Sequence, residues 1–270
     1  HRVVGMISHL GPQLGIADGI ALANTLKQEE LATLVFTGDG GASEGDFHES
    51  LNVAAVWNLP VIFCVENNSW GLSTPSEEQF KCKQFIDKGV GYGMEAIQMD
   101  GNNILEVIRT VRKITEEIRR NPKPVLLEAM TFRVRGHEES SGTKYYPEGI
   151  QEEWAIKDPL SNYEMFLKEE GILTDEIESE YRKELKEHIQ SSFDTAQNEP
   201  LITSDEGKEE ADVFAPYIQN VIEGKGDKKE IRFIDAIQQS LNQSMERYPG
   251  LVLMGQDIAA VSYTHLRAHE

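Results

Sequence analysis

Short apolar runs alternate with longer segments of helical periodicity along the first half of the chain. Runs of strand length occupy residues 32–37, 60–65, 96–99 and 124–130. Between them, apolar residues recur at helical spacing over 12–28, 43–59 and 103–120. Ser43, with Asp46 three positions later, predicts the cap of the second of these helices. Apolar strands alternating with helices are typical of a parallel sheet covered on both faces. We therefore predict a doubly wound α/β domain with buried strands over residues 1–196.

The pattern becomes more polar after this domain. Residues 158–196 predict polar helices with a thin apolar stripe at Ile177, Tyr181, Leu185 and Ile189. Residues 197–229 are rich in Glu, Asp, Lys and Gly and have little periodicity, which is typical of a linker. We therefore expect an acidic linker over 197–229.

A second amphipathic pattern begins near residue 230. Its apolar side, predicted to face inward, consists of Phe233, Ile234, Ile237, Leu241 and Met245. Residues 251–254 then predict a strand. We expect 230–260 to be the truncated start of a second α/β domain. Residues 261–270 do not continue this pattern, and our hypothesis is that they are a non-native tail.

Charge and cysteine content narrow the classes of function. The chain has 26 basic and 46 acidic residues, a formal net charge of −20. Such a balance argues against nucleic-acid binding and against docking on an anionic membrane. No apolar run approaches the roughly 20 residues of a membrane span, and no signal peptide opens the chain. Cys64 and Cys82 have no metal or redox spacing, so we expect a reducing, cytoplasmic compartment.

Polar groups that suit a metal and a phosphate follow two neighbouring predicted strands. Gly-Asp-Gly-Gly at 38–41 follows one strand, and Asn67 and Asn68 follow the next. Ligands of parallel sheets bind at the carboxyl ends of strands. Glycines and a helix N-terminus accommodate phosphate, and a divalent cation such as Mg²⁺ can lie between Asp39 and the phosphate. Taken alone, the Gly-Asp-Gly segment could be an ordinary turn. The paired asparagines after the next strand favour a metal site instead.

These residues resemble a known family. Gly-Asp-Gly followed after 26 residues by Asn-Asn resembles the diphosphate-binding signature of thiamine-diphosphate enzymes. "GDGGASEGDFHE", "NLPVIFCVENNSWGLSTP", "GVGYGM" and "LLEAMTFRVRGH" together resemble the α subunit of the E1 component of 2-oxo acid dehydrogenase complexes. Residues 231–258 are similar to the start of the E1 β subunit. The resemblance therefore implies an α–β fusion, and we expect it to be cut at both ends.

The resemblance implies a role for each matching residue. Mg²⁺ would be held by the Asp39 carboxylate, the Asn68 side chain and the Trp70 carbonyl. The diphosphate would be lined by the glycines Gly38, Gly40 and Gly41. Ser8 and Leu10 would touch the aminopyrimidine end of the cofactor, and His137 would be the active-site histidine near the thiazolium. Alternatives from the residues alone are a structural role for Asn67, a core position for Leu10 and an ordinary loop position for His137.

The implied function is thiamine-diphosphate- and Mg²⁺-dependent oxidative decarboxylation of a 2-oxo acid, branched-chain or pyruvate. The implied partners are that substrate, a lipoyl-bearing E2 acyltransferase and an E1 β-like half, in a homodimer or an α2β2-like assembly. The glutamate that activates the cofactor lies in the β half of this family, so we expect the present chain alone to be inactive. Two alternatives stay open: a transketolase-like enzyme, and a non-catalytic cofactor-holding or assembly subunit.

Overall fold

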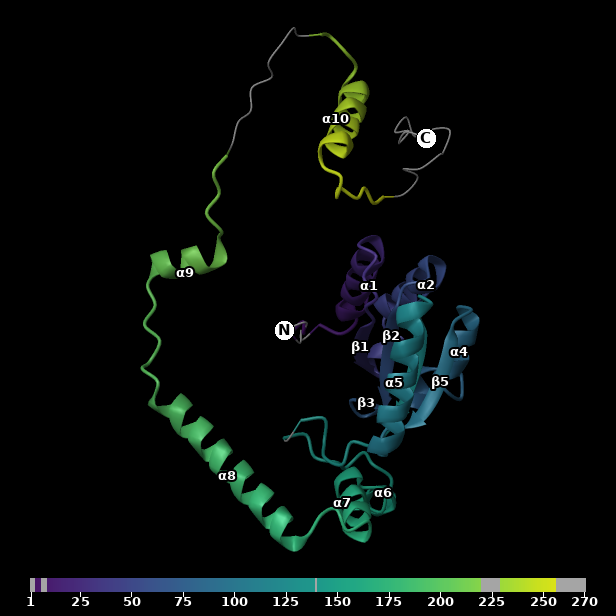
Figure 1. Ribbon diagram of the computed structural model, residues 1–270, viewed down its shortest axis with the longest axis vertical. Coiled ribbons are helices and arrows are strands. Elements are labelled where there is room, and N and C mark those ends of the chain that lie inside the picture. The colour runs from purple at the N-terminus through teal and green to yellow at the C-terminus, as the bar shows by residue number, and fades with distance from the viewer. Residues whose placement is uncertain (1–2, 6–8, 139, 220–228, 256–270) are drawn as a thin grey trace. The chain divides into compact units, whose positions relative to one another are not determined.

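The structure is a computed structural model that describes residues 3–5, 9–138, 140–219 and 229–255 (Figure 1). Contacts divide the chain into two compact units, residues 1–198 and 199–270. The candidate site residues all belong to the first unit, and the second unit is described by itself below.

A four-stranded parallel sheet forms the centre of the first unit. Its strand order is β1-β2-β6-β5. The bounds are Thr33–Gly38 for β1, Val61–Asn67 for β2, Glu95–Asp100 for β5 and Val125–Met130 for β6. Gly38 at the end of β1 is in register with Glu66 of β2. The predicted parallel α/β fold is confirmed, and the ends of β1 and β2 lie side by side.

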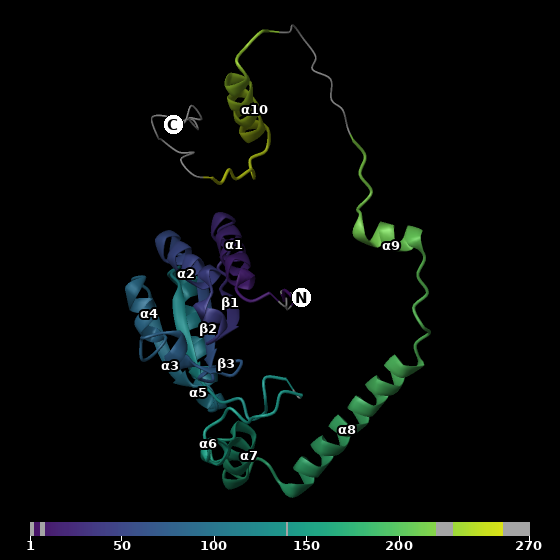
Figure 2. The same cartoon turned by 180° about the vertical axis from the view of Figure 1, so that it is seen from behind.

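Helices cover both faces of this sheet (Figures 1 and 2). Alternate residues of a strand point to opposite faces. In β2, Val61, Phe63 and Val65 belong to one apolar cluster, and Ile62 and Cys64 belong to the other. The first cluster contains residues of α1 (Pro12–Leu26) and α2 (Gly45–Trp57), with Phe85 just before α4 (Ile86–Gly91). The second contains residues of α5 (Ile104–Arg120). The sheet is therefore doubly wound.

The prediction that β1 is buried on both faces is wrong. Leu34 is 41% exposed and Phe36 is 52% exposed, whereas Val35 between them is buried. The reason is the position of β1 at the sheet edge: the cluster formed with α5 takes its strand residues from β2, β5 and β6. Ile108 of α5 also remains 44% exposed for this reason.

The start of α2 also differs from the prediction. Ser43 lies in a short 3₁₀ turn, η1 (Gly41–Ser43), and the residue before the first turn of α2 is Glu44, which makes no side-chain cap. The hydroxyl of Ser43 instead contacts the side-chain oxygen of Gln79 at 3.5 Å. The glycine-rich segment continues for an extra turn before the α-helix begins, so the predicted capping box does not form.

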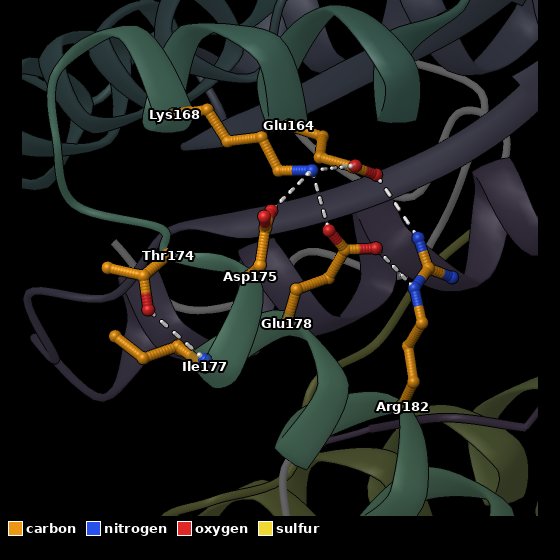
Figure 3. A network of polar contacts seen from close by, with 7 residues as sticks. All are labelled: Glu164, Lys168, Thr174, Asp175, Ile177, Glu178 and Arg182. Atoms are coloured by element: carbon orange, nitrogen blue, oxygen red, sulfur yellow. Dashed lines mark hydrogen bonds and ion pairs between the residues drawn. The ribbon is translucent and has the colours of Figure 1, made fainter.

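Among the residues described after the last strand, the first unit has the helices α6 (Ile150–Ala155), α7 (Pro159–Glu169) and α8 (Asp175–Asn198). A network of charged side chains joins α7 to the first turns of α8 (Figure 3). The ammonium of Lys168 lies 2.9 Å from Glu164 and 2.6 Å from Glu178. Hydrogen bonds from Lys168 and Arg182 lower the pKa of Glu178 to about 2. The network fixes the α7–α8 corner, while the apolar stripe of α8 stays exposed.

The second unit contains two helices among its described residues. One is α9 (Glu206–Val213), which lies in the segment predicted to be a linker, and the other is α10 (Phe233–Arg247). Helix α10 confirms the predicted periodicity, but Phe233 is 82% exposed, so its inward placement is wrong. Residues 251–254 form no strand, since no other strand pairs with them among the described residues. Residues 261–270 lie outside the described residues.

Within the residues that the structure describes, no helix combines the length and apolar character needed to cross a membrane.

Candidate functional site

Asp39, directly after β1, is a buried carboxylate with one hydrogen-bond partner among the described residues. Asp39 is only 1% exposed to solvent. The hydroxyl of Ser76, the first residue of the short helix α3 (Ser76–Gln79), donates to Oδ2 of Asp39 at 2.7 Å. A buried carboxylate needs several polar partners, because removing it from water is costly. This position therefore suits a carboxylate that also binds a cation.

The two asparagines at the end of β2 have different roles. Asn67 accepts from the amide of Ser69 at 3.0 Å and donates to Glu128 at 2.7 Å. Both ends of its side chain are occupied, which agrees with the structural role considered for it. Asn68 is half-buried, and its Oδ1 accepts from the amide of Trp70 at 3.0 Å. An amide oxygen has two lone pairs, so Asn68 retains one for a further partner.

A tight hairpin follows Asn68. Strands β3 (Trp70–Gly71) and β4 (Thr74–Pro75) pair antiparallel. Ser69 and Leu72 have φ values of 66° and 58°, in the left-handed region that non-glycine residues seldom occupy. Such a conformation persists only where surrounding contacts hold it. Here the asparagine side chains provide part of that support.

The hairpin brings the two strand ends together. Ser76, which donates its hydroxyl to Asp39, also donates its amide to the carbonyl of Ser69 at 3.0 Å. A Cβ atom built on Gly40 would lie 2.9 Å from Cα of Gly71, closer than real contacts allow. A glycine is therefore needed where the turn after β1 meets the hairpin after β2. Asp39 and the Asn68–Trp70 turn are neighbours, as predicted.

A fully buried carboxylate, Glu128, binds the asparagine that precedes the hairpin. Glu128 of β6 is 0% exposed. Its oxygens accept from Nδ2 of Asn67 at 2.7 Å and from Nε2 of Gln98 at 3.0 Å. They also accept from the amides of Phe85 and Ile86, at 3.1 and 3.4 Å. Glu128 thus joins the end of β2 to β5 and to the start of α4.

The segment that contains His137 is attached to the same hairpin. The guanidinium of Arg133 lies 3.0 Å from Nδ1 of His137 and donates to the carbonyl of Leu72 at 2.5 Å. Trp70 packs against the rings of Tyr145 and Tyr146, with centroids 5.6 and 5.2 Å away. Because arginine only donates, Nδ1 of His137 accepts, and the neutral ring has its proton on Nε2. His137 itself is exposed.

The N-terminal candidates are only partly described. Ser8 lies outside the described residues. Leu10 is 61% exposed, so the alternative that it is a core residue is wrong for this structure. Gly11 has φ +98°, and a Cβ atom there would lie 2.8 Å from Asp46 at the start of α2. This close approach places Gly11, the residue after Leu10, against the start of α2.

The donor set suits a hard cation that bridges to phosphate. It combines one carboxylate, one side-chain amide oxygen and the backbone of the Asn68–Trp70 turn, and oxygen ligands are those that Mg²⁺ prefers. Gly41 is buried, and a Cβ atom on it would meet the hydroxyl of Thr37 at 2.6 Å. The close packing against Thr37 therefore requires glycine at position 41, and Gly38 and Gly40 add no side chain to the turn either. Mg²⁺ and a diphosphate fit the residues present.

Sequence reasoning missed several residues that position this site. Arg133 and Ser76 gave no signal, since each is an ordinary polar residue in a loop or at a helix start. Glu128 did give one: it is an acid within the apolar run Val-Leu-Leu-Glu-Ala-Met of β6. A charge at the centre of a strand covered on both faces must have buried partners.

The fold defines a class: α/β domains with a parallel sheet covered by helices on both faces, whose ligands bind at the carboxyl ends of the strands. A family model described as "Dehydrogenase E1 component" matches residues 1–204. The chain belongs to the dehydrogenase E1 component family.

Curated relatives agree with this assignment. The chain is 38% identical over 201 residues to 2-oxoisovalerate dehydrogenase subunit alpha of Bacillus subtilis (strain 168), covering 74% of this chain and 61% of that protein. It is 35% identical over 193 residues to pyruvate dehydrogenase E1 component subunit alpha of Bacillus cereus, covering 71% and 52%. It is 34% identical over 190 residues to 2-oxoisovalerate dehydrogenase subunit alpha 2, mitochondrial, of Arabidopsis thaliana, covering 70% and 40%. The chain thus spans less than two thirds of each relative.

Proposed function

We propose that this chain is the α-type part of an E1 component that binds thiamine diphosphate with Mg²⁺ and decarboxylates a 2-oxo acid. The observation behind the proposal is the double contact of Ser76, whose hydroxyl binds Asp39 and whose amide binds Ser69. That contact places a buried carboxylate beside the turn that contains Asn68 and Trp70. Family membership supports the choice of cofactor.

Each candidate residue has a defined task in this proposal. Asp39, the Asn68 side chain and the Trp70 carbonyl hold Mg²⁺, and Gly38, Gly40 and Gly41 lie along the diphosphate. When bound, thiamine diphosphate supplies the carbanion chemistry that decarboxylation of a 2-oxo acid requires. Ser8 and Leu10 contact the aminopyrimidine end of the cofactor.

His137 is the proposed proton donor. Arg133 holds Nδ1 as an acceptor, so the proton on Nε2 is available to a substrate oxygen on which negative charge develops. The same contact disfavours a flipped ring, because a flip would replace Nδ1 by the Cδ2–H group, which cannot accept a hydrogen bond from the guanidinium.

The acyl group produced is proposed to pass to the lipoyl group of an E2 partner. Overall likeness favours branched-chain 2-oxo acids, with pyruvate as the other candidate. We also propose that the segment containing α10 is the start of an E1 β-like half within an α–β fusion. The assembled protein, as a homodimer or an α2β2-like assembly, would provide the β residues that complete the site.

Titration calorimetry with thiamine diphosphate tests this function. We expect binding in the presence of Mg²⁺, and loss of binding with a chelator or in Asp39→Ala. Asp46→Ala removes an exposed carboxylate from the first turn of α2 and is the matched control, with affinity unchanged. Affinity that persists in Asp39→Ala would refute the proposed metal site. If the chain assembled with an E1 β-type partner binds no cofactor, the non-catalytic assembly function becomes the better proposal.

A further inference from the structure

We propose that Lys88 is a positioning residue that holds the turn after Asp39 in its cofactor-binding form. The inference rests on the proposed function and extends it to a residue outside the candidate ligand set. Within the described part of the chain, the Lys88 ammonium binds neither Asp39 nor Asn68; it acts through the backbone of Ala42.

The contact between Lys88 and Ala42 is direct. Nζ of Lys88 donates to the carbonyl oxygen of Ala42 at 3.2 Å. Ala42 is fully buried in the 3₁₀ turn Gly41–Ser43, three residues after Asp39. A buried carbonyl requires a donor, and losing that donor destabilises the conformation that buries it. The ammonium of Lys88 therefore stabilises this conformation of the turn.

Three aromatic rings surround the ammonium. Nζ lies 4.8 Å from the ring centroids of Phe80 and Phe85 and 5.4 Å from that of Phe47. Cation–π attraction partly compensates the ammonium for the water it has lost. Burial lowers the pKa of Lys88, while the nearby Cys82 acts in the opposite direction. Among the described residues, no carboxylate forms an ion pair with it.

An apolar side chain could fill the same space at lower cost. Methionine has nearly the length of lysine and packs well against aromatic rings. A cation in an aromatic cage, without a carboxylate, is costly unless its donors are used. The ammonium donates to the Ala42 carbonyl, and an apolar core residue could not provide this contact with the turn.

Lys88 also belongs to the element that supports the other half of the site. It lies on α4, and the amides of Phe85 and Ile86 at the start of that helix bind Glu128. Glu128 in turn binds Asn67, next to Asn68. The Lys88 side chain of α4 therefore binds the turn after β1, and the amides at the start of α4 bind Glu128, which binds the end of β2. Lys88 helps to set the separation of the two cation ligands.

The test compares substitutions that keep or remove the donor. Lys88→Met keeps the aliphatic packing and removes the donor, and Lys88→Arg keeps a charged donor. Lys83→Met makes the same change at an exposed lysine of the preceding loop. In calorimetry with Mg²⁺, we expect Lys88→Met to bind thiamine diphosphate about tenfold more weakly, which corresponds to the loss of one hydrogen bond of a charged group. Lys88→Arg is expected to restore most of the affinity, and Lys83→Met to leave it unchanged.

The pKa of His48 provides an independent measurement, because the His48 ring packs against Phe47, one of the three rings around the Lys88 ammonium. Burial and then the charge of Lys88 lower the pKa of His48. In an NMR titration of the imidazole, Lys88→Met should therefore raise this pKa, and Lys88→Arg should not. This measurement shows whether the ammonium occupies the cage without requiring any cofactor.

The outcomes separate this inference from the proposed function. If the wild-type chain, assembled with an E1 β-type partner, shows no Mg²⁺-dependent binding, the proposed function is refuted, and this inference with it. Wild-type binding together with an unchanged affinity in Lys88→Met overturns the role of Lys88 alone. If Lys88→Met does not fold, Lys88→Gln, whose shorter side chain stops short of Ala42, takes its place, and wild-type affinity there overturns the proposal equally. A folded Lys88→Arg chain that binds as weakly as Lys88→Met also contradicts it.

Discussion

Replacing Glu128 by glutamine tests whether a buried carboxylate organises the candidate site. Four donors converge on its two oxygens: Nδ2 of Asn67 on Oε1, and Nε2 of Gln98 with the amides of Phe85 and Ile86 on Oε2. A glutamine has one oxygen and one NH₂ group in the same space. Its best placement keeps the oxygen in the position of Oε2, and its NH₂ group then faces the NH₂ group of Asn67.

The cost of this substitution follows from the groups left without partners. Two buried NH₂ groups would face each other, and each unsatisfied donor costs about 1–3 kcal/mol. Asn67 cannot simply flip its amide, because its Oδ1 accepts from the amide of Ser69 at 3.0 Å. We expect the free energy of unfolding to fall by about 3 kcal/mol, within the range for disrupted buried charge networks. For a unit of this size the midpoint of thermal unfolding would fall by about 6–12 °C.

Urea unfolding followed by circular dichroism measures this loss. The matched control is Glu95→Gln, at a partly exposed carboxylate that contacts Lys123 at 2.6 Å. Since exposed ion pairs contribute little, the control should lose less than about 1 kcal/mol. The double variant Asn67→Ala/Glu128→Gln should lose less than the sum of the single variants, because the two share one hydrogen bond. Equal losses at Glu128 and Glu95 would refute the reasoning.

Three further predictions concern separate parts of the molecule. Gly40→Ala places a Cβ atom 2.9 Å from the backbone of Gly71, so calorimetry should show at least tenfold weaker cofactor binding; Gly45→Ala, with no atom within 4 Å, should bind normally. Burial raises the pKa of Asp18 from 3.8 to about 7. Because the folded state then holds the proton more tightly, stability should fall as pH rises from about 4 to 7, and Asp18→Asn should flatten the urea midpoints over that interval. An unchanged slope would contradict this. His137→Asn should lower the turnover of the assembled E1 by about 10²–10⁴-fold and leave cofactor affinity intact, whereas equal losses of both would assign His137 a binding role.

Apolar periodicity was sufficient to predict the parallel sheet. The continuous run Val61–Val65 predicts a strand covered on both faces, and β2 is buried over those residues. The apolar pattern of β1 gave the same expectation and was wrong for one face. Periodicity reports which residues are apolar and does not report which strand lies at the edge of the sheet. Strand order is a property of the whole domain, so Leu34 and Phe36 could not be distinguished from Ile62 and Cys64 in advance.

The candidate ligands were predictable for a different reason. Asp39 and Asn68 stand directly after apolar runs, and parallel strands end at a common edge. Their supporting residues come from distant segments: Ser76 from α3, Arg133 from the loop after β6 and Lys88 from α4. Each of these hydrogen bonds joins segments that are far apart in the sequence, so the local sequence around each residue does not predict it. Glu128 was the exception, because an acid inside an apolar strand indicates buried partners.

The two charged groups attached to α4 explain how the site can be ordered before any cofactor binds. Asp39 and Asn68 lie in turns, where few apolar contacts restrict the backbone. Glu128 fixes the second turn through Asn67, and Lys88 fixes the first through Ala42. Both positions could be apolar at a lower desolvation cost, and a buried charge (Glu128) or half-buried charge (Lys88) without a partner of opposite sign is seldom a gain in stability. Their benefit is therefore geometric: each holds one turn relative to the same helix. If that is correct, Lys88→Met and Glu128→Gln should each weaken cofactor binding, and the double variant should weaken it by nearly the product of the two factors, since the groups act on different turns. A double variant no weaker than the worse single variant would show that α4 does not hold the two turns independently.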